Sequence, residues 1–177
     1  MTETPPPSAG PQPTQPGTTH PGGLFDRFLA RLIDGLVIGI AYIVLSAIFR
    51  PVFISGVDST GELFLFYAVV SILWTALAIG YFAYMESSRG QTVGKMVLKL
   101  RTLGPDGANP TLEQGVRRNI FYAIELLAIV PIIGFWLGPL ASLAAVIFIA
   151  VGINSDTTNR QGWHDHFAGG TRVVKVG

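Results

Sequence analysis

The chain has 177 residues, of which 49% are apolar and only 13% charged, and its mean hydropathy is +0.47. This composition excludes an ordinary soluble domain and indicates an integral membrane protein. The net charge of +1 offers no basic face for nucleic acid, so we expect no nucleic-acid partner. The lack of cysteine excludes disulfides, thiol catalysis and cysteine-ligated metal centres.

The first 23 residues are rich in proline. They hold seven of the twelve prolines, no Lys or Arg, and almost no apolar side chain. Such a segment can neither build a core nor serve as a signal peptide. We therefore predict a disordered proline-rich tail over 1–23, unless a partner orders it, followed by one membrane domain over 24–177.

The apolar stretches predict four transmembrane helices. A span needs about 20 apolar residues, and 28–49 and 62–85 each provide them. The stretch 119–153 is 35 residues long, too long for one span and short for two. It is interrupted at Pro131 and at GFWLGP (134–139), where Gly and Pro predict a tight interfacial turn. The predicted spans are about 28–49, 62–85, 115–131 and 137–153.

The basic residues favour four spans over three. Lys and Arg collect on the cytoplasmic side of membrane proteins. With four spans, eleven of the twelve basic residues share one face and only Arg50 is left on the other. The eleven are Arg27, Arg31, Arg89, Lys95, Lys99, Arg101, Arg117, Arg118, Arg160, Arg172 and Lys175. We therefore predict an all-α, multi-pass protein of the bacterial cytoplasmic (inner) membrane with both termini in the cytoplasm.

Two polar segments predict a small cytoplasmic cap. Apolar and basic residues alternate in 94–102 and again in 171–176, a pattern typical of short strands or of amphipathic segments at the membrane surface. Thr111 followed by Gln114 matches a capping box. This pair predicts a helix over 112–131, leading into the third span.

Three motifs resemble, in order and spacing, those of the RDD family of small bacterial membrane proteins. They are DRFLARLIDGL (26–36), GQTVGKMVLKLRT (90–102) and RQGWHDHFAGGTRVV (160–174). The resemblance covers residues 23–176. The resemblance implies little about function, because the biochemical role of the family is largely unsettled. Transport of unidentified ligands and cation/proton antiport have been proposed for its members. The family's arginine and two aspartates correspond by position to Arg27, Asp34 and Asp165.

Asp34 is an acid within an otherwise apolar span. Helix geometry puts Arg27 and Asp34 about 20° apart around the axis, with Arg31 between them and a depth difference of about 10 Å. A carboxylate in hydrocarbon is costly unless it is paired and turned toward protein. We expect Arg31 or Arg27 to pair with Asp34 as a fixed joint; the alternative is a proton- or cation-carrying acid. We further expect Asp165 to contact Arg27.

Glu125 is a second acid at membrane depth, on the same predicted helix as Asn119. If Glu125 faced Asp34, the two carboxylates could bind a cation or share a proton. The spans offer few other polar groups, so transport would require oligomerisation, for which Gly35-x-x-x-Gly39 provides a packing face of low specificity.

The remaining polar residues predict an interfacial loop rather than a site. GQTVGK lacks the spacing of a phosphate loop, and we expect its lysine to reach lipid headgroup phosphates. WHDHF lacks enough further ligands in the membrane body to favour a metal. The interfacial residues are Gln91, Thr92, Gly94, Lys95 and Trp163.

The sequence favours a non-enzymatic accessory or assembly subunit packed against a larger membrane complex, for which a respiratory-chain assembly is one candidate. The alternative is a homo-oligomeric transporter of small cations, coupled to protons through Asp34 and Glu125. Besides the lipid bilayer, the expected partner is another membrane protein or further copies of this chain. No cofactor is expected, because no cofactor fingerprint or catalytic constellation occurs.

Overall fold

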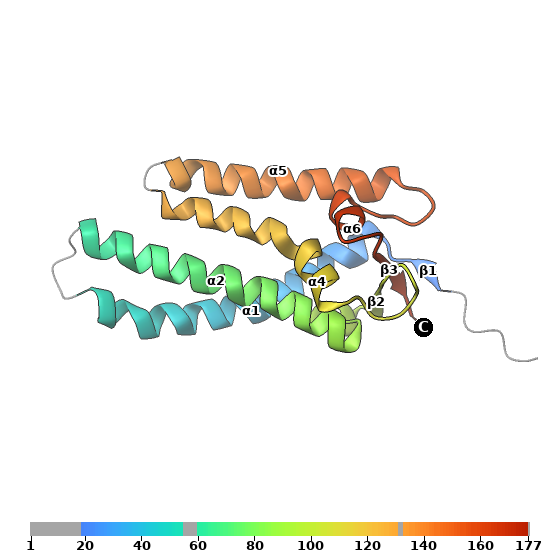
Figure 1. Cartoon of the computed structure of the whole chain (residues 1–177), viewed down its shortest axis with the longest axis horizontal. Helices are drawn as coiled ribbons and strands as arrows, with labels where there is room; N and C mark the ends of the chain where they lie inside the picture. The colour runs from blue at the N-terminus through green and yellow to red at the C-terminus, as the bar shows by residue number, and fades with distance from the viewer. Residues whose placement is uncertain (1–18, 55–59, 131–132, 177) are drawn as a thin grey trace, which may run out of the picture.

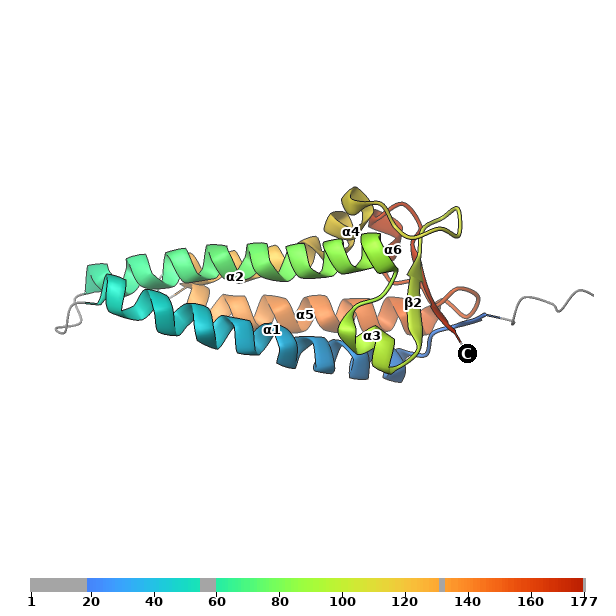
Figure 2. The ribbon, with the colours of Figure 1, turned by 90° about the horizontal axis from the view of Figure 1, so that it is seen from below.

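The computed structural model describes residues 19–54, 60–130 and 133–176. Residues 1–18 of the tail predicted over 1–23 therefore lie outside the described residues. The helices α1, α2 and α5 and the 3₁₀ helix η1 run along the long axis of the molecule, and the short helix α4 lies at one end of it (Figures 1 and 2). Their bounds are α1 (Leu24–Phe53), α2 (Thr60–Arg89), α4 (Leu112–Asn119), η1 (Ile120–Ile129) and α5 (Ile133–Ser155).

Three helices of the described chain are long and apolar enough to cross a membrane: Leu24–Phe53, Thr60–Arg89 and Trp136–Ser155. Each helix contains an apolar stretch of 18 residues. Only 11%, 22% and 11% of these stretches, in the same order, is buried within the molecule. Apolar side chains exposed along whole helices would be unfavourable in water but match the hydrocarbon of a bilayer. The structure is thus mostly helical and suited to a membrane.

The helix predicted over 112–131 begins correctly and then changes character. Thr111 caps α4 through its side chain, and Gln114 returns the bond, so the predicted capping box is present. After Asn119 the chain continues as η1, a 3₁₀ helix of 10 residues, where a continuous α-helix was predicted. A 3₁₀ helix rises about 2.0 Å per residue against about 1.5 Å in an α-helix. The tighter winding lets a short segment reach further along the bundle.

The predicted turn at 134–139 is wrong. Helix α5 begins at Ile133 and contains Pro139, and the connection from η1 lies between Ile129 and Ile133. Proline is tolerated within membrane helices, where neighbouring groups and local adjustments satisfy the backbone groups it frees. Gly and Pro therefore carry less weight as turn signals here than in a soluble chain.

Small elements gather at one end of the molecule, close to the described start of the chain and to the C-terminus (Figure 1). A three-stranded antiparallel sheet has the order β1-β3-β2. Its strands are β1 (His20–Pro21), β2 (Leu100–Leu103) and β3 (Arg172–Lys175), and the short helices beside it are α3 (Val93–Val97) and α6 (Trp163–Phe167).

Two sequence predictions change at this end. The tail was predicted to run to Gly23, but His20 and Pro21 pair with β3, so the folded part begins earlier. The alternating segment 94–102 is a short helix followed by a strand, and the neighbouring residues Gly94 and Lys95 of α3 are both buried, so the two faces do not alternate there. Leu100 packs with Ala30 and Val173 into a small apolar core that ties the sheet to α1.

A buried charged cluster at one end of the helices

Asp34 is fully buried, and three neutral groups donate hydrogen bonds to its carboxylate. The Tyr81 hydroxyl donates to Oδ1 at 2.8 Å, the Thr92 hydroxyl to Oδ2 at 2.6 Å, and the Gly94 backbone N–H to Oδ1 at 2.8 Å. These donors come from α2 and from the start of α3. One carboxylate therefore joins three segments of the chain.

The prediction that Arg27 or Arg31 pairs with Asp34 is wrong. Among the described residues, the ion pairs of Arg27 involve Asp165, and Arg31 donates to the Asn119 side-chain oxygen at 2.8 Å. The predicted inward orientation is nevertheless correct, since Arg27, Ala30, Asp34 and Ile38 form the buried stripe of α1. Helical periodicity identified the face, but it could not identify partners supplied by other segments.

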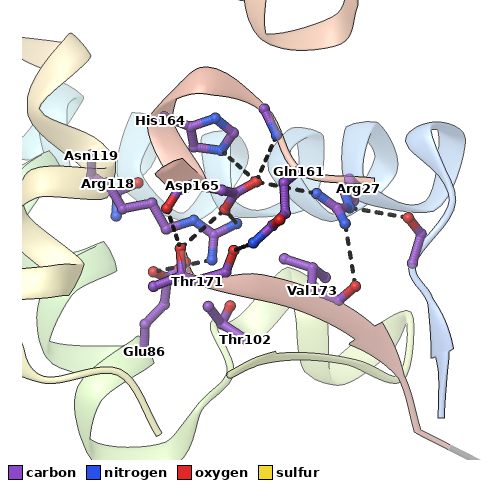
Figure 3. Close-up of polar contacts among 12 residues, drawn as sticks. Arg27, Glu86, Thr102, Arg118, Asn119, Gln161, His164, Asp165, Thr171 and Val173 are labelled. Carbon is purple, nitrogen blue, oxygen red and sulfur yellow. Dashed lines mark hydrogen bonds and ion pairs between the residues drawn. The ribbon is translucent and has the colours of Figure 1, made fainter. Parts of the chain in front are cut away.

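Asp165 lies at the centre of a second set of buried contacts (Figure 3). Its Oδ1 is 3.1 Å from Arg118 Nη2, and its Oδ2 is 3.6 Å from Arg27 Nη1, so the expected contact between Asp165 and Arg27 occurs. The Gly162 N–H and the Thr171 hydroxyl also donate to its carboxylate, at 3.0 Å and 3.2 Å.

The charges around Asp165 set its protonation. Burial alone would raise the pKa of Asp165, but the guanidinium of Arg118 and the other nearby positive groups outweigh burial and hold it below its usual value. The neighbouring imidazole of His164 behaves oppositely, because burial lowers the pKa of His164 to about 3. Asp165 is thus a buried anion at neutral pH, and His164 is neutral.

Glu86 and Lys95 form a further buried ion pair. The Lys95 ammonium donates to Glu86 Oε1 and, at 2.6 Å, to the Thr102 hydroxyl. Arg118 Nη1 is 3.8 Å from Glu86 Oε2, so Arg118 links this pair to Asp165. Burial lowers the pKa of Lys95, and the Glu86 carboxylate opposes that shift. We refer to Arg27, Glu86, Lys95, Arg118, His164 and Asp165 as the charged cluster.

Arg31 lies beside the charged cluster and forms no ion pair with any acid in the described part of the chain. Its guanidinium stacks over the Phe82 ring at 3.9 Å from the ring centroid and donates to Asn119. Asn119 is itself fully buried and donates to the Gly115 carbonyl at 2.9 Å. Asn119, predicted as a supporting polar group of the membrane region, thus positions Arg31.

Glu125 does not join Asp34. It accepts a hydrogen bond from the Ser142 hydroxyl at 2.9 Å, whereas Asp34 is held by Tyr81, Thr92 and Gly94. Glu125 also lines a separate cavity of about 340 Å³. In the described part of the chain, the two acids share neither a hydrogen-bond partner nor a cavity.

The loop residues predicted at the membrane surface are mostly buried. Lys95 is 4% exposed and pairs with Glu86, so it does not reach lipid headgroups as predicted. Thr92 and Gly94 bind Asp34, and the Gln91 side chain donates to the Leu100 carbonyl at 2.8 Å. Trp163 is half-buried and packs near Phe148 and Phe167. These residues therefore make contacts within the protein, most of them with α1, α2 and β2.

Sequence reasoning missed Glu86 and Arg118 as cluster members, although both had a signal. Ala78, Phe82 and Glu86 recur every four residues on the buried face of α2. Arg118 follows the buried Gly115 by three residues on α4. A charged residue that continues the spacing of a buried helix face is expected to have a partner of opposite charge inside the protein. Counting the basic residues in each loop could not reveal such a partner.

The fold and the charged cluster define a helical membrane protein whose buried charges concentrate at one end. The three motifs at 26–36, 90–102 and 160–174 all contribute to that end. A sequence profile of the RDD family matches residues 21–169, and the chain belongs to that family. It is similar to the uncharacterized protein YxaI of Bacillus subtilis (strain 168), with 29% identity over 127 residues, 65% of this chain and 83% of that protein. No solved structure matches the chain.

Proposed function

We propose that the chain is a non-enzymatic accessory or assembly subunit of a larger membrane complex. The observation that carries the proposal is that protein groups already bind the buried carboxylates. Asp34 accepts three hydrogen bonds, and Glu86 and Asp165 each lie between basic side chains. Acids held by fixed hydrogen bonds and ion pairs within the protein suit a structural joint better than a site that must exchange ions.

Four membrane crossings with both termini in the cytoplasm are part of this proposal. The pairing of β1 with β3 supports it, because the beginning and end of the domain then lie on one side, which requires an even number of crossings. The three long apolar helices leave the fourth crossing to α4 and η1. The basic side facing the cytoplasm follows the usual bias of bacterial membrane proteins.

Cysteine labelling tests this topology, since the native chain has no cysteine. Ser155→Cys at the end of α5 should react with an impermeant maleimide only after the cells are permeabilised. Thr60→Cys at the start of α2, at the opposite end of the molecule, is the matched control and should react in intact cells. Labelling of both positions in intact cells would refute the four-crossing arrangement.

The alternative is a homo-oligomeric cation/proton transporter. It is less well supported, because Asp34 and Glu125 lie in separate hydrogen-bonded settings. A Cβ added at Gly35 or Gly39 would meet no atom of the described chain within 4 Å. This surface therefore has space for a second copy of the chain, but the space alone does not favour a second copy over another partner.

Purification in mild detergent at native expression separates the two functions. An accessory subunit should co-migrate with a different membrane protein at fixed stoichiometry. A chain that migrates alone or only with copies of itself would contradict the proposal. The respiratory-chain candidate is tested by whether the co-migrating protein carries a redox cofactor.

A further inference from the structure

A cavity of about 330 Å³ opens beside the charged cluster, between α1, η1 and α5. Its polar lining is entirely basic apart from His164 and Tyr122, and no Asp or Glu of the described residues lines it. The four basic side chains come from α1, α3 and α4. They are Arg27, Arg31, Lys95 and Arg118.

Several donors at this cavity have no hydrogen-bond acceptor among the described residues. They include Nη1 of Arg27 and of Arg31, and both Nε and Nη1 of Arg118. Arg118 is only 2% exposed, and its contact with Glu86 at 3.8 Å is an ion pair but not a hydrogen bond. Buried donors without acceptors are costly and uncommon in folded proteins. Nη1 of Arg27 and of Arg118 face the carboxylates of Asp165 and Glu86. Arg31 Nη1 has no such carboxylate in the described chain, so it is the donor for which an anion in the cavity would supply an acceptor.

The local charge also favours an anion. No carboxylate of the described chain lies within the ion-pair distance of 4.0 Å from Arg31, whose only hydrogen-bond acceptor is the neutral Asn119. Guanidinium groups bind phosphate oxygens through pairs of charge-assisted hydrogen bonds. Besides Arg31, two further arginines and one lysine line the same small cavity.

The rest of the cavity wall is apolar and continues onto the outer surface. Phe28 and Leu32 of α1 are 59% and 53% exposed, and Val146 of α5 is 51% exposed. Ile149 and Ile153 of α5 complete this wall. A free inorganic anion would gain nothing from such a surface, whereas an acyl chain would bury against it.

We propose that this cavity binds the phosphate-bearing headgroup of an anionic membrane lipid, with one acyl chain lying between α1 and α5. Its volume is at the lower end of the usual range of about 300–1,000 Å³ for ligand pockets, which suits a headgroup with the chain outside. Basic pockets between membrane helices on the cytoplasmic side commonly bind anionic lipids. The inference requires the membrane location but not the accessory-subunit role.

The test measures thermal unfolding of the purified full chain in a neutral detergent, titrated with dihexanoyl phosphatidylglycerol. We expect a saturable rise in Tm, because a ligand that binds only the folded state stabilises it. Dihexanoyl phosphatidylcholine and inorganic phosphate are titrated in parallel. An equal rise with phosphatidylcholine would overturn anion recognition, and an equal rise with phosphate would assign the site to a free anion.

Arg31→Gln is the informative variant, because Arg31 has no acid partner among residues 19–54, 60–130 and 133–176 that the change would leave unpaired. Loss of one charge-assisted contact should weaken phosphatidylglycerol binding about tenfold or more, relative to the variant's own baseline Tm. Arg117→Gln removes the same charge from the exposed face of α4 and should leave the affinity unchanged. Unchanged binding by Arg31→Gln would overturn the proposal.

A second variant keeps the test decisive if Arg31→Gln does not fold. Ile149→Trp fills the apolar wall and leaves all four basic side chains in place. It should weaken phosphatidylglycerol binding by blocking the acyl chain. A folded Ile149→Trp chain that binds phosphatidylglycerol as the wild type does would refute the placement of the lipid between α1 and α5.

Discussion

Asp34 is a carboxylate held between helices by neutral donors, with no Lys or Arg of the described residues at hydrogen-bond distance. Two hydroxyls and one backbone N–H converge on its two oxygens. Because these groups come from α2 and from the start of α3, the acid fixes the position of α1 against both. Asp34 is thus a connector between segments far apart in sequence.

Asp34→Asn should destabilise the chain, because an amide has one acceptor oxygen and turns its NH₂ toward groups that are themselves donors. We expect a loss of about 1–3 kcal/mol in the free energy of unfolding, measured by thermal or denaturant unfolding in detergent. Asp26→Asn is the control, since Asp26 is partly exposed and pairs with the partly exposed Lys175. Equal losses in the two variants would contradict the role of Asp34.

Arg118 and Arg117 are neighbours with opposite surroundings. Arg118 contacts Glu86 and Asp165 and is buried, whereas Arg117 pairs with Glu113 and its side chain is 54% exposed. Arg118→Leu should cost about 3–5 kcal/mol, because it leaves buried acids undercompensated, and Arg117→Leu less than about 1 kcal/mol. Unfolding measurements on both variants check this. Similar costs would show that the charged cluster does not hold the fold.

His164 makes stability depend on pH. Its folded pKa of about 3 lies below its unfolded value, so the unfolded chain binds the extra proton first as the pH falls. The stabilisation is complete above the unfolded pKa of about 6.5 and should decline by about 2 kcal/mol between pH 6.5 and pH 5. His164→Asn should flatten the pH profile of Tm over this window, and His166→Asn, at an exposed position, should not. A profile unchanged by His164→Asn would contradict a buried neutral imidazole.

At the scale of elements, the approach of α3 to α1 depends on Gly94. A Cβ at this position would lie 2.0 Å from the Ala30 carbonyl oxygen, a backbone atom that cannot move aside independently. The contact lets the Gly94 N–H reach Asp34, so sterics and hydrogen bonding at this junction are coupled.

Gly94→Ala should therefore separate α3 from α1 and lower the Tm strongly, with a loss above about 3 kcal/mol or failure to fold. Gly39→Ala on α1 is the matched control, because a Cβ there meets nothing within 4 Å. In a helix interior that substitution should be neutral or stabilising by about 0.5–1 kcal/mol. Two variants of equal stability would refute the close approach.

The elements differ in how far the sequence could predict them. Long apolar runs identified α1, α2 and α5, because hydrocarbon imposes both length and composition on a span. The capping box placed the start of α4 at Leu112, since that signal is local. The 3₁₀ winding of η1 had no local signal, and the ion pair of Glu86 with Lys95 depends on a turn after α2 that brings the Lys95 side chain of α3 back to Glu86.

At the scale of the whole molecule, the start of the membrane domain and its C-terminal segment lie side by side. The pairing of β1 with β3 and the contact of Arg27 with Asp165 tie the start of α1 to the segment after α5. The charged cluster and the small sheet lie at this same end of the long helices (Figures 1 and 2). The helices are thus fastened at one end.

Ion flux through the purified chain reconstituted alone in liposomes tests the central claim that the buried charges form a fixed joint. A joint predicts Na⁺ and H⁺ flux no greater than in protein-free liposomes, for the wild type and for Asp34→Asn alike. Flux well above that background in the wild type, abolished by Asp34→Asn in a folded chain, would contradict the account and establish the transporter.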